Sequence, residues 1–265
     1  MIEKITSTQN SKIKNILKLQ QKSSERRKQN LIVIEGLREL SLAIKSGIII
    51  RSVFYCPDII SQEIIQNQLN YDGSFFEITS DIYEKLAYRG STEGVIVLAE
   101  PKFLKLSDLK LKKNPLIIVL ESVEKPGNLG AILRTADAAK VDAVIISDAL
   151  TDIYNPNTIR SSVGCVFTNQ IVACSTEQAI TWLRERGIRT YAAALTAKEF
   201  YHEKDLTGPT AIVMGTEADG LTEKWLKNSN EQIIIPMSGE IDSLNVSTST
   251  AILVFEAMRQ RNFYK

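Results

Sequence analysis

The sequence has few of the residues that build several common kinds of active site. It contains one histidine, His202, so a zinc site or a histidine-based catalytic triad is a poor interpretation, and we expect no metal. None of its three cysteines lies in a CxxC pair, which indicates a reduced, cytoplasmic setting. Its apolar runs, such as 116–120, are far too short to cross a membrane, and residues 1–6 lack the apolar stretch of a signal peptide.

The chain also lacks a clear net charge, but its charges are unevenly distributed. The formal net charge is only +1, which by itself argues weakly against a polyanionic partner. Residues 1–28 carry eight basic and two acidic side chains, residues 29–113 ten and eleven, and residues 114–265 fourteen and eighteen. The whole positive surplus therefore lies in the N-terminal segment. There, the spacing of Ile13, Ile16 and Leu19 predicts one amphipathic helix over residues 8–28.

The first half of the chain predicts an α/β domain over residues 1–105. Apolar strand patterns occur at 31–35, 52–55, 75–78 and 94–99, and helical patterns occur at 37–45 and at 80–87. Residues 106–113 are rich in lysine and have weak periodicity, so we predict a linker. The leucines at 104, 106, 109 and 111 leave a short packed turn open as the alternative.

The second half, residues 114–265, predicts an α/β domain with a mostly parallel sheet. Residues 116–120 form a continuous apolar run, typical of a strand that is buried on both faces. Further strands are expected at 143–147, 170–173, 190–194, 211–214 and 232–235, with helices at 129–139, 176–186 and 246–260. Ligands of such sheets bind at the carboxyl ends of the strands.

Three loops at strand ends carry the functional signal. The first has the pattern N-x-G-x-x-x-R-T-A from Asn128 to Ala136, the second M-G-x-E-x-x-G-L from Met214 to Leu221. The third runs from Ile235-Pro-Met237 to Ser243-Leu-Asn245-Val246.

Taken singly, each loop has a structural explanation. Asn128, Ser243 or Asn245 could cap the helix that follows, and Asp219 is expected to belong to a turn. The first loop has only G-x-x-G, not the G-x-G-x-x-G of a dinucleotide-binding fold, which disfavours a nucleotide-dependent oxidoreductase.

In this order and spacing, the loops resemble the SpoU (TrmH-type) branch of the SPOUT methyltransferases, over residues 114–260. The stretch 33–47, with Val-Ile-Glu-Gly36 and Ser46-Gly47, resembles the L30e-like substrate-binding domain that is often fused to these enzymes. The resemblance implies a two-domain α/β protein whose C-terminal domain contains a deep trefoil knot. It also implies methyl transfer from S-adenosylmethionine to an RNA ribose 2′-hydroxyl.

The resemblance also implies roles for individual residues. The family's catalytic positions correspond to Asn128, Arg134, Glu217, Ser243 and Asn245, and its cofactor site to Gly215, Ile235, Met237 and Leu244. We expect the glycine to let the backbone approach the cofactor. The arginine side chain keeps its proton near neutral pH, because its pKa is about 12.5 or more, so it cannot act as a free general base. We expect Arg134 instead to bind a phosphate bidentately.

RNA binding and assembly follow from the same resemblance. RNA phosphates attract clustered basic side chains, and our candidates are Lys12, Lys14, Lys18, Arg26, Arg27 and Arg160. A solvated helix face is the simpler explanation of the first five. Family members are homodimers through the knot domain, and the apolar stretch 252–258 of the last helix fits such an interface.

Two alternatives to a 23S ribosomal RNA methyltransferase stay open. One is a transfer RNA 2′-O-methyltransferase, and the other is a non-catalytic RNA-binding or ribosome-assembly protein with the same fold. The L30e-like segment favours ribosomal RNA by analogy.

Overall fold

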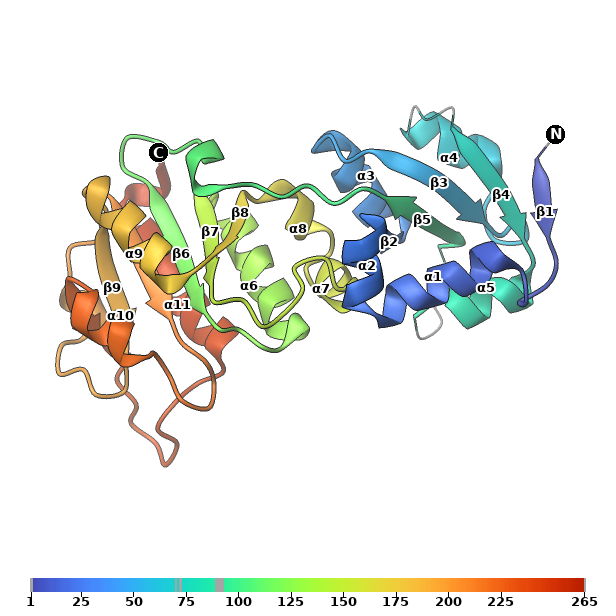
Figure 1. Ribbon diagram of the computed structural model, residues 1–265. Coiled ribbons are helices and arrows are strands. Elements are labelled where there is room, and N and C mark those ends of the chain that lie inside the picture. Colours follow the sequence, from blue (N-terminus) through green and yellow to red (C-terminus); the bar gives the residue numbers. More distant parts are fainter. Residues whose placement is uncertain (1, 70, 72, 89–92, 265) are drawn as a thin grey trace. The chain divides into compact units, whose positions relative to one another are not determined.

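The computed structural model describes residues 2–69, 71, 73–88 and 93–264 (Figure 1). Contacts divide the chain into two compact units. The first comprises Met1–Lys102 and Asp152–Thr168, and the second comprises Phe103–Thr151 and Asn169–Lys265. Each unit contains one β-sheet with helices packed on it, so the predicted α/β class is confirmed. That the segment 152–168 belongs to the first unit was not predicted from the sequence.

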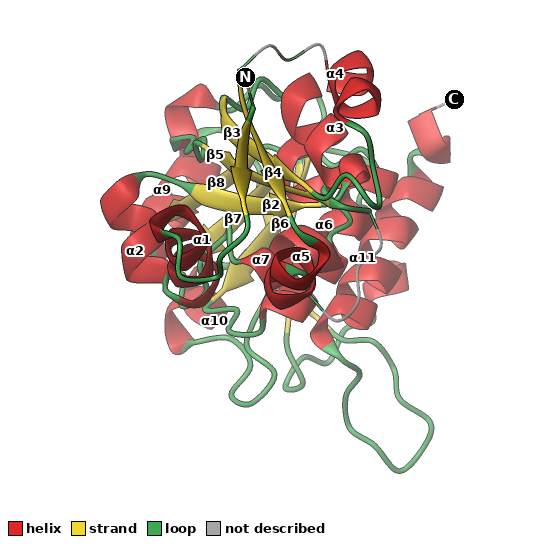
Figure 2. Cartoon of the chain, turned by 90° about the vertical axis from the view of Figure 1, so that its right-hand side faces the viewer, coloured by secondary structure: helices red, strands yellow, loops and turns green. Residues whose placement is uncertain are grey.

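The first unit contains a mixed five-stranded sheet. Its strands are β1 (Glu3–Ile5), β2 (Ile32–Glu35), β3 (Ile50–Tyr55), β4 (Ser74–Ile78) and β5 (Val95–Ala99). Its helices are α1 (Ser11–Gln21), α2 (Ser23–Gln29), α3 (Leu37–Lys45), α4 (Gln62–Leu69), α5 (Ser80–Leu86), α7 (Pro156–Ser161) and α8 (Cys165–Thr168). The strand order is β1-β4-β3-β5-β2, and β5 is antiparallel to both neighbours. Helices α1 and α5 lie side by side and share one apolar core (Figure 2).

The predicted single helix over residues 8–28 is wrong, because the helix breaks at Lys22. Lys22 adopts an extended conformation between α1 and α2. Arg26 of α2 turns back and donates from Nη1 to the carbonyl oxygens of Leu19 (2.5 Å) and Gln20 (3.3 Å). A helix leaves its last carbonyls without partners, so this guanidinium completes the C-terminus of α1. The break is therefore stabilised by a side chain four residues beyond it.

Arg26 is also wrong as a candidate for RNA contact. Its side chain is only 4% exposed, and its Nε donates to Oδ2 of Asp152 at 2.7 Å. Asp152 lies at the start of the segment 152–168, whose helix α7 contacts β2 and whose helix α8 contacts α3. Gly164 permits the second contact, because a Cβ there would lie 3.0 Å from the Glu39 Cα, and its φ is +80°. The buried charge of Arg26 thus serves the packing of the first unit.

The second unit contains a six-stranded, fully parallel sheet. Its strands are β6 (Leu116–Glu121), β7 (Ala143–Ser147), β8 (Ile171–Cys174), β9 (Arg189–Ala193), β10 (Thr210–Met214) and β11 (Glu231–Ile233). Its helices are α6 (Pro126–Ala138), α9 (Thr176–Glu185), α10 (Glu223–Asn228) and α11 (Val246–Gln260), with short 3₁₀ turns at Leu106–Asp108, Tyr201–Glu203 and Asn262–Tyr264. The strand order is β11-β9-β10-β6-β7-β8, and every pair is parallel, as predicted.

The parallel sheet is buried because helices cover it. All five residues of 116–120 in β6 have no exposed surface, which confirms the expectation for this apolar run. Helix α9 contacts β7, β9 and α10, whereas α11 contacts α6 and β10. The segment predicted as a linker contains the 3₁₀ turn 106–108, and its Leu106, Leu109 and Leu111 pack against the core cluster that includes residues of α9. The packed turn that these leucines left open is therefore formed. Among the described residues, no helix combines the length and apolar composition needed to cross a bilayer.

The burial of Arg26 generates a stability prediction. Asp152→Ala leaves a buried guanidinium without its counter-charge, which should lower the free energy of unfolding of the first unit by about 3 kcal/mol. Both tryptophans, Trp182 and Trp225, belong to the second unit, so amide hydrogen exchange in β2 and α7 is the suitable measurement. Arg27→Ala, at an exposed neighbour, should change little, and equal protection in both variants would contradict the assigned role of the ion pair.

Candidate active site

The site lies where the chain reverses its direction of travel through the parallel sheet. From β6 the chain moves outward to β7 and β8, then returns to form β9, β10 and β11 on the other side. The switch point lies between β6 and β10, the position at which open parallel sheets bind ligands. The loops after β6 and β10 leave the sheet there side by side, because Leu120 pairs with Met214.

A network around the Glu217 carboxylate joins three of the five predicted catalytic residues. Asn128 donates its amide to Glu217 Oε1, and the Asn245 amide nitrogen lies 3.2 Å from the same oxygen. The Asn245 amide also donates to Asn128 Oδ1 at 3.3 Å. Lys125 forms an ion pair with the other oxygen, Oε2. Three segments therefore meet at one carboxylate, and Asn128 lies 89 residues before Glu217 and 117 before Asn245.

Local helix geometry explains how the two asparagines reach Glu217. We expected Asn128 to cap a helix beginning at Leu129, but α6 begins at Pro126, so Asn128 lies in the first turn and its side chain is available. Proline is favoured there because its missing N–H would have no helical partner. Asn245 does cap α11, as the sequence allowed, because its Oδ1 accepts from the backbone N–H of Ser247 at 2.9 Å. The oxygen of the Asn245 amide therefore caps α11, while its nitrogen contacts Glu217.

The loop that carries Glu217 is held at its base by a buried carboxylate. Glu121, the last residue of β6, is 2% exposed. It accepts from the Thr222 backbone N–H at 2.8 Å and from the Thr222 hydroxyl at 2.7 Å. The other end of the loop is the strand β10, which pairs with β6. Both ends of the loop 215–221 are thus fixed to the carboxyl end of β6.

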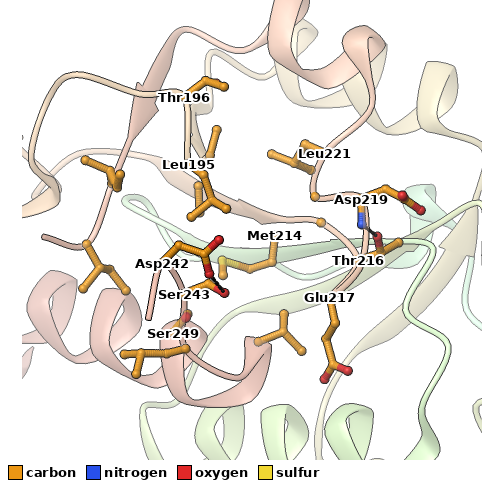
Figure 3. A pocket seen from close by; sticks show the side chains of 18 of the residues that line it. Leu195, Thr196, Met214, Thr216, Glu217, Asp219, Leu221, Asp242, Ser243 and Ser249 are labelled. Carbon is orange, nitrogen blue, oxygen red and sulfur yellow. Dashed lines mark hydrogen bonds between the residues drawn. The ribbon is translucent and has the colours of Figure 1, made fainter. Parts of the chain in front are cut away.

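Gly215, which we expect to let the backbone approach the cofactor, is also required by the turn in which it lies. A Cβ at this position would lie 2.2 Å from the carbonyl carbon and oxygen of Gly220. The turn closes through the Thr216 N–H, which donates to the Gly220 carbonyl at 3.0 Å, and the Asp219 N–H, which donates to the Thr216 hydroxyl. Thr216 therefore makes the side-chain contact that closes the turn in which Asp219 lies. Figure 3 shows the Glu217 and Asp219 side chains pointing in different directions from this loop.

A cavity of about 600 Å³ opens beside this loop, within the size range of small-molecule sites. The four residues predicted to bind a cofactor, Gly215, Ile235, Met237 and Leu244, all line it. Leu195 and Met214 add apolar surface, and Thr196 and Ser249 add hydroxyl groups (Figure 3).

The charges around this cavity are of one sign. Its lining includes the carboxylates of Glu217, Asp219 and Asp242, whereas no lysine or arginine occurs among the described lining residues. Such a cavity favours a ligand with a positive centre and disfavours one with a pyrophosphate.

Two predicted catalytic residues lie apart from the Glu217 network. Ser243 lines the cavity and donates its hydroxyl proton to Asp242 at 3.0 Å. Arg134 is exposed on α6, and its side chain has no hydrogen bond or ion pair with any residue in the described part of the chain. The guanidinium is therefore available to an external anion.

The remaining basic candidates belong to the first unit. Lys14, Lys18 and Arg27 are exposed, whereas Lys12 pairs with Glu3 at 2.9 Å. Arg160, on α7, is exposed and stacks on the Tyr88 ring, with 3.9 Å between its Cζ and the ring centroid.

Sequence reasoning missed three side chains that contact the site or support its loop: Lys125, Glu121 and Asp242. Lys125 contacts Glu217, Asp242 contacts Ser243, and Glu121 holds Thr222 at the end of the loop that carries Glu217. Neither Lys125 nor Glu121 lies near its partner in the sequence. The only signal in the sequence was for Glu121, a charged residue that directly follows the apolar run 116–120, where a strand ends.

Metal and thiol chemistry find no support in the described residues. They contain no group of three or more histidine, cysteine, aspartate or glutamate side chains that could hold a metal. Burial raises the pKa of the Cys174 thiol to about 11, so this side chain is a poor nucleophile near neutral pH.

Comparison with known families matches both halves of the chain. Residues 115–255 match the family described as "SpoU rRNA Methylase family", and residues 10–97 match the "MRM3-like substrate binding domain". The two matches together cover most of the chain.

Comparison with individual proteins gives relatives that match along nearly their whole length. The 23S rRNA (guanosine(2553)-2′-O)-methyltransferase RlmP of Bacillus subtilis is 28% identical over 96% of this chain and 98% of its own. A crystal structure of an RNA 2′-O ribose methyltransferase is 36% identical, with a TM-score of 0.86 over 98% of this chain and 99% of that one. An AdoMet-bound rRNA methyltransferase from Sinorhizobium meliloti is 29% identical, with a TM-score of 0.88 over 97% and 98% of the two chains.

The closed turn at Gly215 generates a prediction that needs no ligand. Gly215→Ala forces a methyl group against the Gly220 backbone, which should lower the free energy of unfolding of the second unit by about 3 kcal/mol. Trp182 and Trp225 fluorescence during urea unfolding reports on this unit. Gly239→Ala is the matched control, because a Cβ there meets nothing within 4 Å. Equal unfolding midpoints for the two variants would show that the turn is not closely packed.

Proposed function

The chain belongs to the SpoU rRNA methylase family, and we propose on this premise that it transfers a methyl group from S-adenosylmethionine to a ribose 2′-hydroxyl of 23S ribosomal RNA. The observation that carries the proposal is the juxtaposition of a cavity lined by carboxylates with the Glu217 network at the switch point of the sheet. The RlmP relative, whose name states this activity, matches along almost the full chain, and so does a solved RNA 2′-O ribose methyltransferase.

The cavity suits S-adenosylmethionine in size and in charge. Ile235 and Leu244 offer apolar surface for an adenine ring, while Glu217, Asp219 and Asp242 favour the positive sulfonium and ammonium groups. A dinucleotide would bring two phosphates to the same carboxylates, which argues against the oxidoreductase alternative. When bound, S-adenosylmethionine supplies an electrophilic methyl group, and the ribose oxygen attacks it.

The side chains of the site can orient that oxygen. Because the Ser243 hydroxyl donates to Asp242, its oxygen keeps lone pairs free to accept a hydrogen bond from the ribose hydroxyl. Asn245 contributes by holding Asn128 and Glu217 in place. Arg134 provides a fork for a phosphate beside the target ribose. Holding the reacting groups in this geometry accounts for much of the expected rate enhancement.

The first unit is proposed to bind RNA through its exposed basic face. The exposed Lys14, Lys18 and Arg27, together with Lys12 and Arg160, are retained as candidates for phosphate contacts. We also propose that the first unit is the L30e-like substrate-binding domain predicted over 1–105, and that the second is the knotted methyltransferase domain predicted over 114–265. The segment 106–113, predicted as a linker, packs on the second unit, and 152–168 belongs to the first.

The proposed assembly is a homodimer through the knotted domain. On α11, Phe255 is 41% exposed and Ile252 is half-buried, so this helix presents apolar surface to a second copy. A monomer in sedimentation at working concentration would reject the dimer. A ribosomal RNA substrate agrees with the cytoplasmic setting expected from the free cysteines.

The proposed activity is tested with purified protein, labelled S-adenosylmethionine and unmodified transcripts of 23S ribosomal RNA and transfer RNA. We expect calorimetry to detect S-adenosylmethionine but not NAD, and label to enter only the 23S transcript as a 2′-O-methyl group. Arg134→Lys keeps the charge but loses the fork, so kcat/KM should fall about 10- to 100-fold while cofactor affinity is unchanged.

Three results would contradict the proposed activity, its RNA substrate or the role of Arg134. Cofactor binding without transfer to either RNA would favour the non-catalytic alternative, and label in transfer RNA alone would change the substrate. A wild-type rate for Arg134→Lys would remove the proposed phosphate fork.

The basic face is tested by point substitutions, because truncating residues 1–28 would remove Ile13, Ile16 and Leu19 from the core. The combined Lys14→Gln, Lys18→Gln and Arg27→Gln variant removes three exposed charges. Its log affinity for the 23S transcript should depend less steeply on log salt concentration, with the slope smaller by about 2. S-adenosylmethionine affinity should not change. An unchanged salt slope would leave these residues as a solvated helix face.

A further inference from the structure

Lys125 is the one cation in the described part of the Glu217 network, and none of the roles proposed above includes it. It precedes α6 and forms an ion pair with Glu217 Oε2. Asn128 and Asn245 donate to the other oxygen, Oε1. Because the amides and the ammonium use different oxygens, Glu217 keeps its two amide donors if the lysine leaves.

The ion pair is sufficiently exposed to exchange. The Lys125 side chain is 68% exposed and that of Glu217 is 27% exposed. Water screens both charges of such a pair, so the pair contributes little to stability and costs little to break. A lysine is also a mobile point charge with rotatable donors, unlike the planar fork of arginine. Lys125 can therefore turn to another anion without disturbing the fold.

Without Lys125, the side chains around it would repel a polyanion, because the charged ones are carboxylates. A small hollow beside the cavity is lined by Glu124, Lys125, Asn128, Thr216 and Glu217, together with apolar and small residues. The two carboxylates of this hollow face one ammonium group, and the large cavity adds only acidic charges. RNA whose ribose reaches Ser243 and Asn245 must bring its phosphates near these carboxylates.

We infer that Lys125 is a phosphate-binding residue of the RNA site, and that its ammonium moves from Glu217 to a phosphodiester of the bound RNA. The inference rests on the proposed function and adds a contact on the catalytic unit to the RNA site. In the free protein Lys125 neutralises Glu217, and in the complex it neutralises RNA, while Asn128 and Asn245 keep Glu217 in position. A phosphate contact of this kind positions the RNA without reading its sequence.

The test compares Lys125→Gln, Lys125→Arg and wild type on the unmodified 23S transcript. Lys125→Gln should weaken RNA binding about fivefold in fluorescence anisotropy and raise KM for RNA to the same extent. The slope of log affinity against log salt should become smaller by about 0.7 to 0.9, the effect of one phosphate contact. Affinity for S-adenosylmethionine should change less than affinity for RNA, and kcat at saturating RNA should change less than KM, because Asn128 and Asn245 still hold Glu217. Lys125→Arg should restore binding.

The matched control is Lys113→Gln, an exposed lysine of the same unit before the amino end of β6, which should behave as wild type. If Lys125→Gln lowers kcat or cofactor affinity with an unchanged salt slope, Lys125 only supports Glu217 and the inference is overturned. Wild-type RNA affinity for Lys125→Gln overturns it as well, while the proposed function stands. If the wild-type protein neither binds S-adenosylmethionine nor methylates RNA, the proposed function fails, and the inference fails with it.

Discussion

The candidate site depends on the Glu217 carboxylate, because three side chains from two separate segments of the second unit donate to it. Lys125 lies just before α6, Asn128 lies in the first turn of α6, and Asn245 lies at the start of α11. A carboxylate accepts at both oxygens, so one side chain can satisfy all three donors at once. Without it, the amides of Asn128 and Asn245 would retain only their weaker mutual contact of 3.3 Å.

The position of Glu217 is in turn set by the sheet. Strand β10 pairs with β6 along its whole length, and Glu121 at the end of β6 accepts both donors of Thr222. The loop between these two points closes tightly because Gly215 has no side chain. The loop therefore loses its conformational entropy during folding, before any ligand binds. A ligand meets side chains that are already in place, and such preorganisation is what makes polar groups effective in catalysis.

Charge is divided between the two units in a way that net charge conceals. The cavity of the second unit is lined by carboxylates, whereas the exposed candidates for RNA contact Lys14, Lys18 and Arg27 lie on helices of the first. A sulfonium cofactor and a polyanionic RNA need opposite surroundings, and one chain supplies both. Arg26 shows that composition alone overstates the basic face, because this arginine completes the end of α1 and pairs with Asp152.

The sequence by itself determined the α/β class, the six strands of the second unit and three loops with a family's spacing. Alternation of apolar runs with amphipathic helices is a local property, so it can be read along the chain. Only the tertiary structure decided which of these residues meet. The break at Lys22, the burial of Arg26, the support of Thr222 by Glu121 and the pairing of Lys125 with Glu217 all depend on partners beyond the local helix or loop. The contacts of Glu121 and Lys125 form when strands β6 and β10 become neighbours, and the burial of Arg26 requires the segment 152–168 to join the first unit. Hydrophobic periodicity carries no information about either pairing.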